Sequence, residues 1–108
     1  MRDGDPRFVT FPPQPGLDQL RWYIQQTAEG KLTIREFLAD FRRLHEDAER
    51  VGPPSYHSPE EARAIWDVLW AVEFCAVDAA DKETPEDWYI PEEVQVIIQR
   101  AVQHIVRA

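Results

Sequence analysis

Apolar and polar residues along this 108-residue chain recur mostly at spacings of three and four, which is the period of an α-helix. The first such stretch, 17–29, carries its apolar residues on one face and is followed by Gly30, a residue favoured just after a helix. No stretch shows the sustained alternation of a half-buried strand, and no short hairpin turn or internal repeat is evident. The pattern predicts an all-α protein: a compact antiparallel bundle of about four helices with an extended, proline-rich N-terminal arm.

The start of the second helix is marked by a capping box. In this motif the Thr33 hydroxyl accepts a hydrogen bond from the backbone N–H of Glu36, and the Glu36 carboxylate accepts one from the N–H of Thr33. We therefore expect a helix from about Ile34 to just before Gly52-Pro53-Pro54, which cannot continue it. Its expected core face consists of Ile34, Phe37, Leu38, Phe41, Leu44 and Ala48.

The third helix has the clearest start in the chain. Ser58 is a favoured N-cap, Pro59 suits the first helical position, and two glutamates follow in the first turn, where they favour the helix dipole. We expect this helix to run to about Val77 and, because it is apolar around much of its circumference, to be the central one. Its apolar residues, including the two tryptophans expected in the core, are Ile65, Trp66, Val68, Leu69, Trp70, Val72, Phe74 and Val77.

The two ends of the chain complete the predicted architecture. Pro91 and two following glutamates open a fourth helix, whose apolar residues recur at spacings of three and four nearly to the end of the chain. The segment 1–16 contains Phe8 and Phe11 among four prolines. This composition favours an extended arm that its aromatic residues hold against the body of the protein. We thus expect an arm over residues 1–16 and a single helical-bundle domain over 17–108.

Negative charge is concentrated in one region. The net charge is -8, and 73–93 holds eight acids and one base, whereas the rest of the chain holds twelve acids and eleven bases. Such a region repels a phosphate backbone and attracts a basic protein surface. The charge pattern therefore argues against direct nucleic-acid binding and for a basic protein partner.

Other chemistry has little support in the sequence. The single Cys75 excludes an internal disulfide, the three histidines form no ligand pair, and no glycine-rich phosphate loop is present. The acids after Val77 do not match a calcium loop, because Ala80 and Lys82 interrupt the alternating oxygen ligands. We expect no catalytic site, metal or cofactor. Since no apolar run resembles a signal peptide or a membrane span, we also expect a cytoplasmic protein.

The connection between the third and fourth helices is the candidate partner-binding site. It combines carboxylates with two aromatic residues, which are favoured anchors at protein interfaces, and two prolines that stiffen the segment. The alternative is a solvated face that maintains solubility, with the aromatic residues covering the core. The candidate residues are Asp78, Asp81, Glu83, Glu86, Asp87, Trp88 and Tyr89.

Several motifs resemble the small all-helical immunity proteins of bacterial toxins, especially the colicin D immunity type. They are Gly-Lys-Leu-Thr-Ile-Arg-Glu-Phe-Leu-Ala-Asp-Phe at 30–41, Ile65-Trp66-Asp67-Val68-Leu69, the acidic aromatic connection, and Pro91-Glu92-Glu93-Val94. Trp88-Tyr89-Ile90-Pro91 is also similar to the aromatic pair and proline that DNase-colicin immunity proteins present to their toxins. The resemblance implies a cytoplasmic inhibitor that binds a nuclease toxin and covers its basic active site with carboxylates.

The sequence is compatible with three functions. The leading hypothesis is a stoichiometric inhibitor whose carboxylates mimic nucleic-acid phosphates. The second is an interaction or scaffold module, monomeric or a homodimer, that joins through an apolar helix face such as 34–44 or 94–106. The third is a small enzyme, which would need a pocket that perturbs the pKa values of its carboxylates.

Overall fold

The computed structural model describes residues 4–52, 55–75 and 89–105. Its elements are the α-helices α1 (Leu17–Ala28), α2 (Ile34–Val51), α3 (Pro59–Glu73) and α4 (Pro91–Ala101), and the short 3-10 turns η1 (Pro6–Phe8) and η2 (Val102–His104). Over these ranges there is no strand, only an isolated bridge between Cys75 and Tyr89. The predicted all-α class is confirmed.

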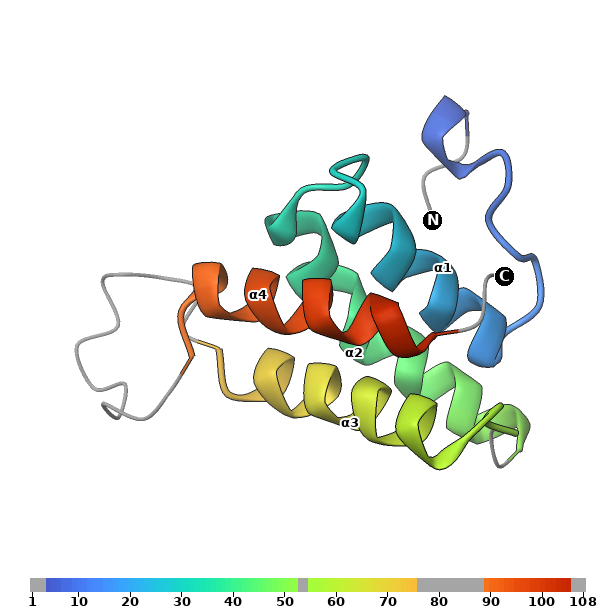
Figure 1. Ribbon diagram of the computed structural model, residues 1–108. Coiled ribbons are helices and arrows are strands. Elements are labelled where there is room, and N and C mark those ends of the chain that lie inside the picture. The colour runs from blue at the N-terminus through green and yellow to red at the C-terminus, as the bar shows by residue number, and fades with distance from the viewer. Residues whose placement is uncertain (1–3, 53–54, 76–88, 106–108) are drawn as a thin grey trace.

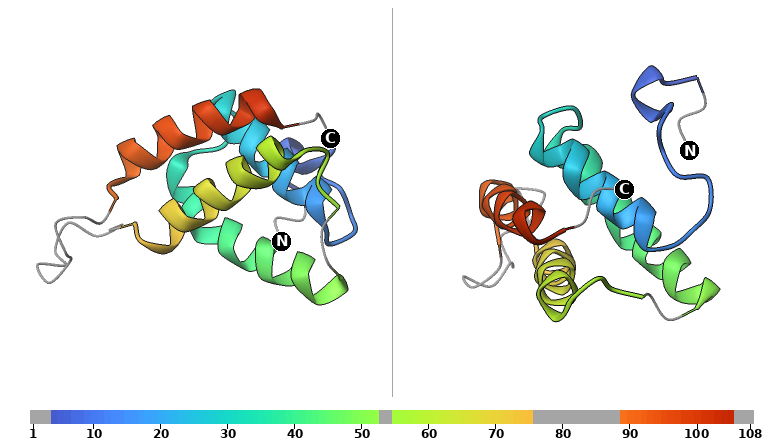
Figure 2. Two further views of the ribbon diagram at one scale, coloured as in Figure 1. Left: turned by 60° about the horizontal axis from the view of Figure 1, so that its bottom comes forward. Right: turned by 45° about the vertical axis from the view of Figure 1, so that its right-hand side comes forward.

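Consecutive helices run in opposite directions and form two layers (Figure 1). Helices α3 and α4 lie side by side in one layer, and α1 and α2 form the other, as the turned views of Figure 2 show. The core lies between the layers, where Phe37 and Phe41 of α2 stack with ring centroids 4.6 Å apart. Of the helices described, none is both long and apolar enough to cross a membrane.

The predicted start of α2 is confirmed in detail. The N–H of Glu36 donates to Thr33 Oγ1 at 3.1 Å, and the N–H of Thr33 donates to Glu36 Oε1 at 3.0 Å. The end of α1 also agrees with the prediction. Gly30 adopts a φ of 79° after the helix, a backbone conformation that is sterically unfavourable for residues with a Cβ atom. These local signals fix where α1 ends and α2 begins.

The start of α3 is held by a buried ion pair as well as by its cap. Ser58 Oγ accepts the N–H of Glu61 at 3.1 Å, as the N-cap pattern predicted. The Glu61 side chain is fully buried, and its carboxylate accepts Arg21 Nη2 at 2.6 Å, Arg21 Nε at 3.2 Å and the His57 N–H at 2.9 Å. The hydrogen bonds that Arg21 donates to Glu61, and the one that it donates to Asp18, raise the pKa of its guanidinium. The pair therefore joins α1 to the first turn of α3.

The N-terminal arm packs against α1 through its aromatic residues, as expected. The rings of Phe8 and Phe11 each lie 5.1 Å from the ring of Trp22. Arg7 extends from the turn η1 to Glu36 at the start of α2, with Nη2 2.8 Å from the carboxylate. This hydrogen bond, followed by that from the Thr33 N–H, lowers the pKa of Glu36 to about 2.

Two expectations for the third helix were wrong. Helix α3 ends at Glu73 and not near Val77, which lies outside the described residues, because the chain turns at Phe74, whose carbonyl accepts the Tyr89 N–H at 2.9 Å. The helix is also not central: it packs against α4 and α2 and leaves a face exposed. Trp66 and Trp70 lie on that face and are 49% and 59% exposed.

The fourth helix is shorter than predicted. Helix α4 begins at Pro91 as expected, with the Ile90 N–H donating to Glu93 Oε1 at 3.2 Å, but it ends at Ala101. The chain then tightens into the 3-10 turn η2, a common way for a helix to end. The apolar periodicity continues through this turn, since Ile105 is still buried, so periodicity alone could not place the helix end.

The ion pair of Arg21 and Glu61 generates a stability prediction. Replacing Arg21 by Met keeps an apolar stem but leaves a buried carboxylate without its cation, so we expect a loss of about 3–5 kcal/mol in the free energy of unfolding. Urea denaturation measures it. The matched control is Arg35→Met, at an exposed arginine that forms no ion pair with any described residue, which should change stability by less than about 0.5 kcal/mol. Adding Glu61→Leu to Arg21→Met should recover part of the lost stability. Equal effects of Arg21→Met and Arg35→Met would show that the ion pair does not stabilise the fold.

The lowered pKa of Glu36 generates a pH prediction. Because this pKa is about 2 in the folded chain against an ordinary value of 4.5, the contribution of Glu36 to stability is complete above pH 4.5 and is lost as the pH falls toward 2. The difference in unfolding free energy between the wild type and Glu36→Gln should therefore be largest at neutral pH and shrink below pH about 4. A difference that stays constant from pH 7 to pH 2.5 would show that the carboxylate charge is not responsible.

Candidate functional site

Most of the predicted site residues fall in the part of the chain that the structure does not describe. Asp78, Asp81, Glu83, Glu86, Asp87 and Trp88 lie outside the described residues, so their contacts stay predictions. Tyr89 is described and is half-buried, with its ring packed against the core. The interpretation of Tyr89 as a residue that covers the core is therefore supported, whether or not it also contacts a partner.

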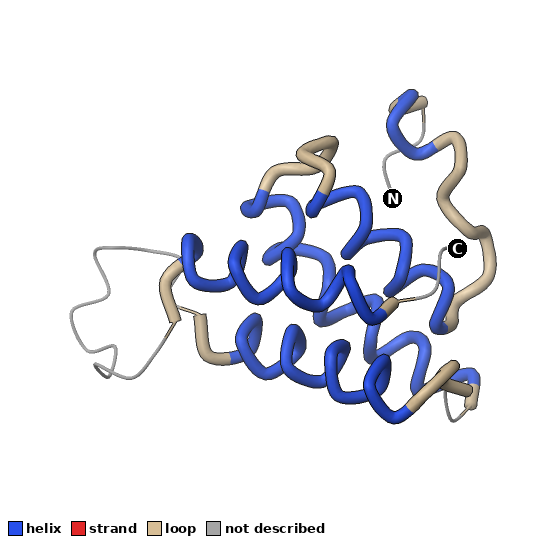
Figure 3. Tube along the Cα trace, viewed as in Figure 1, coloured by secondary structure: helices blue, strands red, loops and turns tan. Residues whose placement is uncertain are grey.

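The residues on either side of the undescribed segment are paired. Cys75 and Tyr89 form a parallel bridge, and the Tyr89 N–H donates to the carbonyl oxygen of Phe74 at 2.9 Å. Figure 3 shows the short connections that leave α3 and enter α4 meeting at one end of the helix pair. The five predicted acidic site residues thus belong to a segment that begins and ends at a single place on the molecule.

Exposed carboxylates surround this pairing. Glu73 ends α3, Glu92 and Glu93 open α4, and all three are exposed. Burial raises the pKa of the Cys75 thiol, and the negative charges of Glu92 and Glu93 raise it further. One cation approaches from α2, where Arg42 Nη2 lies 3.4 Å from Glu73 Oε1, and both side chains remain exposed. The described residues at this end of the molecule are therefore acidic, as is the sequence of the segment between them.

Apolar side chains lie beside these carboxylates. Trp70 is 59% exposed and packs one side against Phe74, with ring centroids 4.6 Å apart, and Ile90 is 48% exposed. Neither was among the predicted site residues, and Trp70 was expected in the core. The available signal was that α3 has more apolar positions than one buried face of a four-helix protein can hold. An acidic surface with exposed apolar side chains is suited to binding a basic protein.

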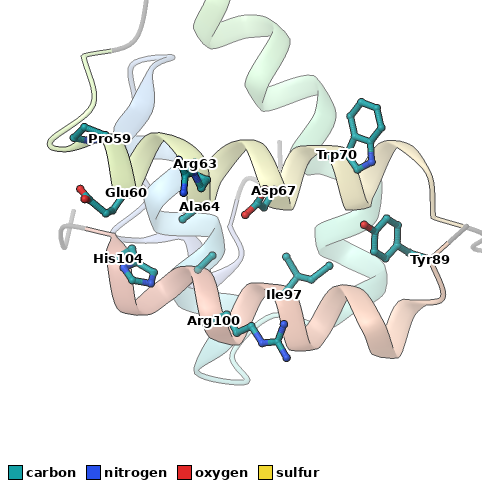
Figure 4. Close-up of a pocket in the computed structure, with 11 residues that line it drawn as sticks. Pro59, Glu60, Arg63, Ala64, Asp67, Trp70, Tyr89, Ile97, Arg100 and His104 are labelled. Atoms are coloured by element: carbon teal, nitrogen blue, oxygen red, sulfur yellow. The ribbon is translucent and has the colours of Figure 1, made fainter. Parts of the chain in front are cut away.

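A groove between α3 and α4 was not predicted at all. It has a volume of about 480 Å³, and Figure 4 shows side chains from both helices around it. Arg63 and Asp67 of α3 line one side of it, and Arg100 of α4 lines the other side with its guanidinium extending away from α3. Tyr89 lies at its end next to Trp70, with the phenol hydroxyl turned toward the groove. The walls come from residues far apart in the sequence, so no local motif marks the groove.

The described residues hold no group of three or more potential metal ligands. The histidines lie apart, as their positions in the sequence suggested. His45 is buried on α2 with its ring 5.0 Å from that of Trp66, His57 precedes α3, and His104 is exposed in η2. The contact with His45 covers part of the Trp66 side chain.

The burial of Cys75 generates a prediction for the paired connections. Because Cys75 is only 8% exposed and the pKa of its thiol is raised, we expect reaction with a thiol reagent to require the pairing with Tyr89 to open. We expect modification of the folded protein at pH 8 to be at least about 100-fold slower than in strong urea. A rate close to that of the unfolded chain would mean that this pairing does not persist in solution.

Comparisons of the chain with protein-family models, with curated proteins and with solved structures found no match. The features of the chain that bear on its function are the acidic region 73–93, the pairing of Cys75 with Tyr89, and the exposed apolar residues Trp70 and Ile90.

Proposed function

We propose that this chain is a non-catalytic inhibitor, an immunity protein of the cytoplasm, that binds a basic nuclease toxin domain and covers its active site. The observation that carries the proposal is the pairing of Cys75 with Tyr89, which brings the residues on either side of the acidic segment together beside the exposed carboxylates of Glu73, Glu92 and Glu93. An acidic surface concentrated at one end of a molecule that is otherwise nearly neutral complements the cationic cleft in which a nuclease holds phosphates.

In this proposal the carboxylates take the place of nucleic-acid phosphates. Asp78, Asp81, Glu83, Glu86 and Asp87 contact the basic residues of the toxin. Attraction between opposite charges accelerates the encounter and selects the partner more than it raises the affinity. The proposal therefore needs apolar contacts as well.

The apolar contacts come from residues next to the carboxylates. Tyr89 and the neighbouring Trp88 supply aromatic surface, and Trp70 and Ile90 extend it with exposed side chains. Aromatic anchors ringed by charged residues are the usual composition of a tight interface. Binding of this kind needs no cofactor and no catalytic group in the chain.

A second candidate function is an interaction module that uses the outer face of α3. The apolar residues of 34–44 and 94–105 lie largely in the core or pack against it, so a homodimer through those faces would require the bundle to open. The observation that favours an interaction module is instead the exposure of Trp66 and Trp70, one helical turn apart. Such an assembly would persist at high salt, because apolar contacts are not screened.

Charge removal in the acidic segment tests the inhibitor. The triple variant Asp81→Asn, Glu83→Gln, Glu86→Gln should bind its toxin about tenfold or more weakly, mainly through slower association. The measurement is surface plasmon resonance against the basic nuclease domains encoded beside the gene of this chain, together with inhibition of their nuclease activity at equimolar protein.

The matched control removes the same charge elsewhere. The variant Glu46→Gln, Asp47→Asn, Glu49→Gln changes the C-terminal half of α2, at the opposite end of the molecule from Cys75 and Tyr89 (Figure 1). It should bind within about twofold of the wild type. An equal loss of affinity in both variants would mean that only the net charge matters. Full binding by the acidic-segment variant would mean that the interface lies on a helix face instead.

A further inference from the structure

The N-terminal arm lies along α1 and is held there by side chains of the helix. The Pro12 carbonyl oxygen accepts Gln19 Nε2 at 2.9 Å near the start of α1. Farther along the helix, Thr10 Oγ1 accepts Trp22 Nε1 at 3.1 Å. The arm therefore follows α1 in the opposite direction (Figure 1). The bundle presents a surface that binds an extended segment.

An ion pair and aromatic contacts define what this surface recognises. Arg7 donates from Nη1 and Nη2 to the two carboxylate oxygens of Glu36 at 3.0 and 2.8 Å, a paired geometry that a lysine cannot form. The rings of Phe8 and Phe11 each lie 5.1 Å from the ring of Trp22. The surface thus fits an arginine with aromatic residues directly after it and four positions later.

The arm covers the core without being part of it. None of its described residues is buried, whereas Trp22 and Tyr23 beneath it are 4% and 3% exposed. Lifting the arm would uncover the faces of these two rings that Phe8 and Phe11 contact, and would leave the contacts among the four helices in place. The rings therefore need a cover, but the cover need not come from the same chain.

The connection between the arm and α1 works against closure within one chain. Residues 12–16 are Pro-Pro-Gln-Pro-Gly, and the chain bends over 13–16 so that the arm curves back along the helix (Figure 2). A proline fixes its own φ and biases the preceding residue toward an extended backbone, so this composition favours a straight connection. A straight connection carries the arm away from its own bundle, where a second bundle can receive it.

We propose that the surface formed by Trp22, Tyr23 and Glu36 binds the arm of a second copy of this chain, so that two copies exchange arms and form a dimer. Arg7 of each copy then pairs with Glu36 of the other. Because the contacts are the same as in the monomer, exchange costs little and depends on concentration. The arm lies far from the pairing of Cys75 with Tyr89, so this dimer is independent of the inhibitor function (Figure 1).

The first test uses the wild-type chain. Carbon-13-labelled and unlabelled chains are mixed in denaturant and refolded together, which lets the arms redistribute. A short connection gives an effective concentration of roughly a millimolar, so dimer should be measurable by sedimentation at about 1 mM protein. Isotope-filtered nuclear magnetic resonance should then detect contacts between the Phe8 or Phe11 ring of one chain and the Trp22 ring of the other. A protein that stays monomeric at this concentration would overturn the proposal.

Two charge-reversed variants test the site itself. In Arg7→Glu and in Glu36→Arg, the arm meets a like charge on its own bundle and on any copy of the same variant, so each variant alone should be monomeric. In an equimolar mixture, both exchanged arms again meet an opposite charge. The mixture should therefore contain at least about tenfold more dimer than either variant alone, as measured by sedimentation.

The matched control carries both substitutions in one chain. Arg7→Glu with Glu36→Arg restores opposite charges without requiring a second variant, so this chain should again divide between monomer and dimer as the wild type does. Circular dichroism checks that each variant keeps its helices, because Glu36→Arg also removes the hydrogen bond from the Thr33 N–H. A mixture of helical variants that forms no more dimer than its components would overturn the proposal. If a variant misfolds, the wild-type experiment decides alone.

Discussion

The arrangement of this protein depends on the ion pair between Arg21 and Glu61. A fully buried carboxylate is costly unless it is paired and hydrogen-bonded, and Glu61 satisfies that requirement with Arg21 and with the N–H of His57. The same residue lies in the first turn of α3, whose start is capped by Ser58. The pair thus ties the start of α3 to α1, and α3 in turn packs beside α4.

The position of α3 shapes both the acidic end of the molecule and the groove beside α4. Its C-terminal end leads directly to Cys75, which pairs with Tyr89 just before α4, so the acidic segment begins and ends at one place. Its solvent-facing side supplies Trp70 to that end of the molecule, and its other exposed side chains form one wall of the groove. Binding residues on a rigid helix pair lose little conformational freedom when a partner arrives, which favours affinity.

The sequence predicted best what local chemistry decides. Two helix starts are marked by residues close together in the chain, Thr33 with Glu36 and Ser58 with Pro59. Both predicted starts were confirmed. It failed where an apolar residue could lie on either side of a helix: Trp66 and Trp70 have the same periodicity as core residues, and only the packing of α4 and α2 leaves them outside. Pairing between distant residues was likewise invisible, because no spacing rule links Arg21 with Glu61. The region of the candidate site could be found from charge alone, whereas the contribution of Trp70 and Ile90 and the whole of the groove required the fold.

The proposed inhibitor depends on electrostatic attraction between the acidic end of the α3–α4 pair and a basic protein. The salt dependence of the association rate constant tests it most directly, because attraction between opposite charges is screened over about 10 Å at 0.1 M salt. With a cognate nuclease domain, raising the salt from about 0.05 M to 0.5 M should slow association about tenfold or more while changing dissociation much less. An association rate that does not change over this range would contradict the claim.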